Sequence, residues 1–103
     1  MMKDKDIHIG DVLMIRSWED MLNDGFLTED GHISFRYSFN DIEFSANMRH
    51  LCGRMFTVIC KMDNYFLGRT IYMSDERVER DGIRGHLPWL ITADMLEPYR
   101  GGI

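Results

Sequence analysis

The segment from Ile33 to Phe39 constrains the fold most, because apolar and polar residues alternate there over seven positions. A period of two residues places the four apolar side chains on one face of a β-strand. Four further segments are rich in β-branched and aromatic residues and predict short strands: 12–16, 55–60, 65–73 and 89–92. We expect 55–60 and 65–73 to form a hairpin. The sequence therefore predicts a mainly β protein with about five short strands.

Two helical insertions are predicted between the strands. Residues 17–22 combine a possible Ser17 cap with apolar residues at i, i+3 and i+4. In residues 44–51 apolar residues recur at i, i+4 and i+7, which also predicts a helix, and Gly53 follows as a helix stop. The charged, glycine-containing segment 74–85 predicts a long exposed loop. Short antiparallel strands bury their apolar faces best by curling into a small barrel, so we predict a five-stranded barrel with two short helical insertions.

The length of 103 residues predicts a single domain over 1–103, with frayed ends at 1–6 and 101–103. A membrane-spanning helix needs about 20 apolar residues, and the apolar runs here are only a few residues long. The first residues contain no apolar signal core, which favours a cytoplasmic protein. In that compartment Cys52 and Cys60 are expected to be free thiols rather than a disulfide.

The net charge of −5 is unevenly distributed along the chain. Residues 1–47 contain four basic and ten acidic residues, whereas residues 48–103 contain eight basic and seven acidic residues. Acidic runs at Glu19–Asp20 and Glu29–Asp30 would repel a phosphate backbone. They are either a solvated surface or a face that docks on a basic partner.

Three stretches together resemble a known family: Gly10–Arg16, Met48–Val58 and Trp89–Pro98. Their order and spacing are similar to those of small SH3-like barrel proteins encoded by phages and prophages, mostly of Firmicutes and usually described only as hypothetical. The resemblance implies an SH3-like five-stranded barrel that Trp89 fills, and a binding module rather than an enzyme. The segments 27–44 and 75–86 depart from the family pattern, and such additions favour a function particular to this chain.

Catalytic and metal chemistry find little support in the sequence. His50, Cys52 and Cys60 could supply three metal ligands, but their spacing matches no recognised metal motif. The same cysteines could form a dyad with a histidine, although nothing in the spacing supports one. We therefore expect no enzyme activity, no metal and no cofactor.

The sequence supports binding residues better than catalytic or metal-ligating ones. Arginines in the 75–86 segment alternate with carboxylates, which favours protein docking over phosphate binding. Those tyrosines that remain exposed would make interface anchors. The candidate binding residues are Glu19, Asp20, Glu29, Asp30, Tyr65, Tyr72, Arg77, Arg80 and Arg84.

These observations predict a non-enzymatic binding module of phage or mobile-element origin. We expect it to bind and inhibit a host protein or ribonucleoprotein in the bacterial cytoplasm, as an anti-defence or anti-CRISPR protein does. Two alternatives stay open. One is a nucleic-acid- or ribosome-associated SH3-like barrel, and the other is a structural or assembly protein of a phage.

Overall fold

Strands make up most of the regular structure, as predicted for a mainly β protein. The computed structural model describes residues 2–35, 43–64, 69–74, 77–80, 83–86 and 91–100, with the backbone alone for 64, 69, 77–80 and 83–86. Along these residues the elements are η1 (Asp4–Asp6), β1 (Val12–Ile15), α1 (Trp18–Asp24), β2 (Phe26–Leu27), β3 (Ile33–Ser34), η2 (Ala46–Leu51), β4 (Met55–Asn64), β5 (Arg69–Ser74), β6 (Arg77–Arg80), β7 (Ile83–His86), η3 (Ala93–Met95) and β8 (Leu96–Pro98), where η is a 3-10 helix.

The main sheet has four antiparallel strands in the order β5-β4-β1-β8. β1 is central, with Met14 opposite Met55 of β4 on one side and Glu97 of β8 on the other. β4 and β5 form the predicted hairpin, and β4 has a bulge between Val58 and Cys60. A bulge increases the local bend and twist of a strand, which lets β4 pair with both β1 and β5.

The predicted five-stranded barrel is not confirmed. In the described residues the outer edge of β5 meets a single bridge residue, Ile91, whose carbonyl oxygen accepts from Tyr72 N–H at 2.8 Å. The chain then continues through η3 into β8 at the opposite edge of the sheet. One bridge supplies too few hydrogen bonds to close the sheet. The described part of the fold is therefore an open sheet whose β5 edge is met by the chain at Ile91 alone.

Both predicted helical segments exist, but the second is shorter and tighter. Ser17 caps α1 as expected, because its hydroxyl accepts from Asp20 N–H at 3.1 Å. The second helix is 3-10 and begins only at Ala46. Phe44 instead exchanges two backbone hydrogen bonds with Ile33, at 2.8 and 3.0 Å. Gly53 ends this segment at φ 82°, a conformation that glycine adopts without strain.

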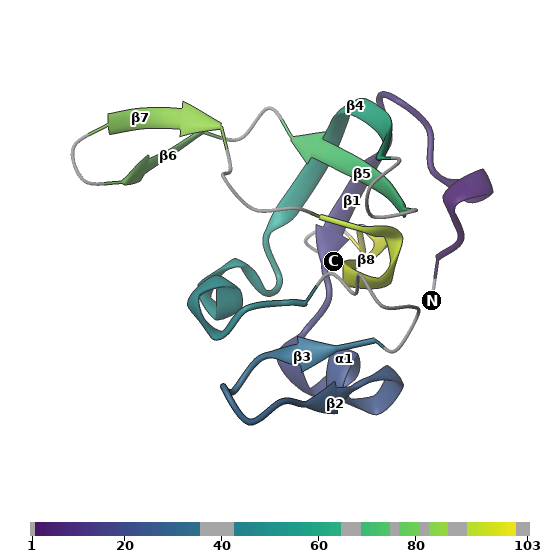
Figure 1. Ribbon diagram of the computed structural model, residues 1–103. Helices are drawn as coiled ribbons and strands as arrows, with labels where there is room; N and C mark the ends of the chain where they lie inside the picture. Colours follow the sequence, from purple (N-terminus) through teal and green to yellow (C-terminus); the bar gives the residue numbers. More distant parts are fainter. Residues whose placement is uncertain are drawn as a thin grey trace.

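Several predicted strand boundaries differ from those observed. The prediction of a loop over 74–85 is wrong, since β6 and β7 pair there as a second hairpin. That hairpin extends to one side of the main sheet (Figure 1). The close of the chain at 96–98 is also a strand, because its backbone pairs with β1. Strand is present at 33–34 of the predicted strand 33–39 and at 69–73 of the predicted strand 65–73, whereas 36–39, 65–68 and Trp89 lie outside the described residues.

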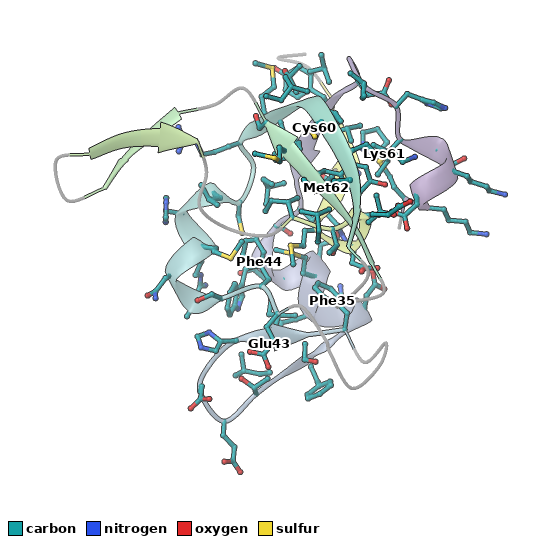
Figure 2. The ribbon with its side chains drawn as sticks, turned by 45° about the horizontal axis from the view of Figure 1, so that its top comes forward. Phe35, Glu43, Phe44, Cys60, Lys61 and Met62 are labelled. Atoms are coloured by element: carbon teal, nitrogen blue, oxygen red, sulfur yellow. The ribbon has the colours of Figure 1, made fainter. Side chains whose placement is uncertain are left out.

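The core lies on the inner side of the main sheet. Leu13 and Phe56 point inward from β1 and β4 and join buried residues of η2 and η3 in one cluster. Phe35 and Phe44 extend that cluster toward β3 (Figure 2). The insertion between β1 and β4 therefore contributes to the core rather than looping out from it.

The start of the chain is held against the sheet, although residues 1–6 were predicted to fray. Asp4–Asp6 form η1, and Ile7 is fully buried. Lys61 Nζ on β4 donates to the carbonyl oxygens of Asp4, at 2.7 Å, and of Ile7, at 3.0 Å. The hydroxyl of Tyr72 donates to Asp4 Oδ1 at 2.6 Å. Figure 2 shows Lys61 on β4, on the side of this N-terminal turn.

Candidate functional site

Residues 17–35 form a lobe below the main sheet that we call the acidic lobe. It consists of α1, β2 and β3, which lie together in Figure 1. The segment contains five carboxylates and no lysine or arginine. Ser17 and the acidic first turn favour α1 locally, because both interact with its free N–H groups. The lobe thus concentrates negative charge on a short structured segment.

The lobe presents acidic and apolar groups together. Glu19 has 78% of its side chain exposed, and Glu29 and Asp30 are exposed in the turn between β2 and β3. On β2 the side chain of Phe26 is partly exposed and that of Leu27 is 56% exposed. Exposed apolar side chains beside like charges are typical of a docking surface, where the apolar groups are buried and the charges set orientation.

A buried arginine fixes the lobe to the sheet. Arg16 follows β1 and is only 4% exposed. Its guanidinium donates to Asp20 Oδ2 at 2.8 Å, to the Asp20 carbonyl at 3.0 Å, to Asp24 Oδ2, and to the Asp94 carbonyl at 2.7 Å. Each of the guanidinium nitrogens is therefore used, which suits a buried cation.

Arg16 and Asp20 shift each other's pKa. Burial works against the charged form of Arg16, but hydrogen bonds to Asp20 and Asp24 outweigh it and raise the pKa of the guanidinium. The hydrogen bond from Arg16 lowers the pKa of Asp20 in turn. Asp20 and Asp24 are thus engaged by Arg16, whereas Glu19, Glu29 and Asp30 are the exposed charges of the lobe.

An aromatic contact supports the other side of α1. The Trp18 ring meets Phe44 edge to face, with centroids 6.2 Å apart. The guanidinium of Arg49, on η2, lies 4.9 Å from the centroid of the Trp18 ring and 4.0 Å from Glu19. This stacking holds η2 against α1 and places one cation at the margin of the acidic lobe.

A surface hollow of about 610 Å³ lies between α1, η1 and β8. Its lining residues are Met2, Asp6, Arg16, Asp20, Asp24, Leu96, Glu97, Pro98 and Arg100. The mixture of carboxylates and arginines suits a polar, charged group better than an apolar ligand. Among the residues that the structure describes, no three histidine, cysteine or acidic side chains gather as they would around a metal ion.

The structure brings only part of the predicted binding set together. Glu19, Asp20, Glu29 and Asp30 all lie in the acidic lobe. Tyr72 is not available as a surface anchor, because it is 1% exposed and its hydroxyl is bonded to Asp4. Tyr65 lies outside the described residues.

The three predicted arginines lie on the second hairpin, away from the lobe. Arg77 pairs with His86, and Glu79 pairs with Arg84, in the β6–β7 register. Arg80 is the last residue of β6. The candidates thus fall into two separate groups rather than one continuous face (Figure 1).

Both cysteines are free and half-buried, as expected. Burial raises the pKa of the Cys52 thiol, which favours its neutral form. A neutral thiol is a poor nucleophile and a poor metal ligand. Cys52 instead packs at the edge of the core.

The arginine cluster was missed by sequence reasoning. The signal was present in the i, i+4 spacing of Arg16 and Asp20, which places two side chains on one side of a helical turn. The contact with Asp94 had no such signal, because it joins positions 78 residues apart. The apolar pair Phe26 and Leu27 was also missed.

Comparison with known proteins adds no family: no protein-family model, curated protein or solved structure matches this chain. Within the described residues, no helix has the length and apolar character that crossing a membrane would require.

Proposed function

We propose that this protein is a non-enzymatic binding module of phage or mobile-element origin, which docks its acidic lobe on a basic surface of a host macromolecule. The observation that carries the proposal is the lobe itself, with five carboxylates, no lysine or arginine, and exposed Phe26 and Leu27. A surface of this kind matches the cationic groups with which proteins hold nucleic acids. Its occupation would inhibit such a partner in the host cytoplasm, as an anti-CRISPR or other anti-defence protein does.

The strand connections support an SH3-like scaffold for this module. The order β5-β4-β1-β8, with the Tyr72–Ile91 bridge and a 3-10 turn before the last strand, is the path expected of such a small barrel. On that scaffold the acidic lobe is an insertion between β1 and β4. Insertions on a rigid scaffold are where binding functions concentrate.

The test is affinity capture from bacterial lysate, followed by measurement of binding to the purified partner. We expect a nucleic-acid-binding host protein whose complex weakens with salt. The variant Asp30→Lys should weaken binding several-fold, because it reverses an exposed charge of the lobe. Asp63→Lys makes the same change in net charge on exposed β4 and should bind like the wild type. Capture of no host protein, or equal binding by both variants, would overturn the proposal.

A second candidate function is direct association with nucleic acid. The observation that favours it is the β6–β7 hairpin, which extends away from the main sheet and contains Arg77, Arg80 and Arg84 (Figure 1). A two-stranded ribbon fits the major groove of DNA. Titration of the purified protein with labelled DNA and RNA separates the two functions, because only direct association predicts binding without a host protein. That binding should weaken steeply between two salt concentrations.

A further inference from the structure

A histidine joins the acidic lobe to the second helix through one hydrogen bond. Ala46 is the first residue of η2, and its backbone N–H donates to Nδ1 of His32 at 2.9 Å. The next amide of the helix, that of Asn47, donates to the Ser45 hydroxyl at 3.2 Å. The first amide of η2 is therefore bound by a titratable side chain, and the second by a hydroxyl that does not titrate.

The backbone around His32 fixes the position of its ring. His32 N–H donates to the Thr28 hydroxyl at 3.1 Å, and the His32 carbonyl oxygen accepts from Thr28 N–H at 2.7 Å. The adjacent residue, Ile33, exchanges two backbone hydrogen bonds with Phe44. The turn 28–32 and the segment that leads into η2 are thus held side by side, and the imidazole spans the distance between them.

The hydrogen bond to Ala46 requires a neutral imidazole. A backbone N–H can only donate, so Nδ1 of His32 must offer its lone pair, and the proton of the neutral ring lies on Nε2. The imidazolium has an N–H at both nitrogens and no acceptor. Protonation at Nδ1 would therefore set two donors against each other at 2.9 Å, and the contact would break.

The charged and titratable groups on the elements around His32 are mostly acidic. These exposed groups are Glu29, Asp30, Glu43, Arg49 and His50. The first two share the turn with His32, and Glu43 precedes the bridge residue Phe44 beside β3 (Figure 2). The last two lie on η2. An imidazolium that leaves Ala46 therefore has carboxylates nearby to which it can donate.

We propose that His32 is a pH-sensitive latch between the acidic lobe and η2. The neutral imidazole holds the turn 28–32 against the first residue of the helix, and the imidazolium releases it. Histidine is the side chain that changes its charge between about pH 8 and 5. The contact with Ala46 is exposed, so water can take over the freed amide and the response is a local opening rather than unfolding. The inference does not depend on the proposed function, because it concerns a contact within the chain.

The test follows the Ala46 amide of the full chain by NMR between about pH 8 and 5. A hydrogen-bonded amide proton resonates downfield, so the Ala46 signal should move upfield in acid, with the same midpoint as the Cε1 proton of His32. Long-range proton–nitrogen spectra at the upper pH should place the ring proton on Nε2. A neutral ring with its proton on Nδ1, or an Ala46 signal that does not follow the His32 ring, would overturn the proposal.

Two asparagine variants separate His32 from the other histidine nearby. His32→Asn offers a carboxamide oxygen in place of Nδ1, and this acceptor does not titrate, so the Ala46 signal should stay downfield at every pH. His50→Asn is the matched control, because His50 is exposed on the same helix as Ala46, and it should keep the wild-type response. Circular dichroism verifies that both variants fold. A His32→Asn variant that keeps the response, or a His50→Asn variant that loses it, would assign the titration to another group and overturn the latch.

Discussion

Arg16 donates from Nη1 to the backbone carbonyl oxygen of Asp94 at 2.7 Å, although 78 positions separate the two residues. The same guanidinium holds α1 through Asp20 and Asp24. One side chain thus joins the end of β1, the acidic lobe and the turn before β8. The orientation of the lobe relative to the sheet depends on this contact.

Arg16→Met should destabilise the fold by about 3 kcal/mol, because it removes a buried cation and leaves the Asp94 carbonyl and two carboxylates without their partner. Urea unfolding followed by circular dichroism measures this loss. Arg49→Met is the control, since the contacts of Arg49 with Trp18 and Glu19 are exposed to solvent, and it should cost less than about 1 kcal/mol. Equal losses of unfolding free energy in the two variants would show that the buried contacts of Arg16 contribute no more to stability than the exposed contacts of Arg49.

Stability should fall in acid partly through Asp20. The hydrogen bond from Arg16 lowers the pKa of Asp20 in the folded protein below its ordinary value of 3.8. The stabilisation is therefore complete at pH values above 3.8 and is lost as the pH falls through the lower, folded value. Asp20→Asn should flatten the dependence of the urea midpoint on pH below about 5. In an Arg16→Met background the same substitution should leave that slope unchanged, and a further change there would contradict the assignment.

Gly25→Ala should be more damaging than Gly31→Ala. A Cβ at Gly25 would collide with the backbone carbonyl oxygen of Ser34, which cannot rotate away. Gly31 has open space around it, and its φ of 83° costs an alanine only about 1 kcal/mol. We expect a loss of about 3 kcal/mol for Gly25→Ala in urea unfolding. The reverse order of the two losses would argue against close contact between the end of α1 and β3.

Lys61→Met should release the N-terminal turn. Lys61 Nζ is bonded to two backbone carbonyls of that turn, and loss of these bonds costs about 1 kcal/mol. Hydrogen exchange at the Asp6 and Ile7 amides should become several-fold faster. Lys5→Met removes an exposed lysine from the turn itself and provides the control. Unchanged exchange in Lys61→Met would mean that burial of Ile7 alone holds the segment.

Local elements were predictable where a single residue determines the backbone conformation of its immediate neighbours. Ser17 capped α1 and Gly53 ended η2 as expected, because a hydroxyl acceptor and a positive φ are local requirements. The β4–β5 hairpin was predicted for the same reason. The strand at 96–98 was not predicted, since nothing in three residues that end at Pro98 shows that β1 lies within hydrogen-bonding distance.

The site was predictable only as a charge pattern. Clustered acids in the first half of the chain indicated an acidic face, and four of the predicted residues do share one lobe. The sequence could not show that Asp20 is engaged by Arg16 or that Tyr72 is buried against Asp4, because both depend on contacts across the fold. The separation of the arginines from the lobe likewise follows from the β6–β7 pairing.

The position of β1 between β4 and β8 has a consequence for how the chain folds during its synthesis. β1 is synthesised before β8, yet Leu13 pairs with Pro98. Until residue 98 has left the ribosome, one edge of Val12–Ile15 has no strand beside it. Between the synthesis of β1 and that of β8 the nascent chain therefore has an apolar, unpaired strand edge, and docking of β8 covers it.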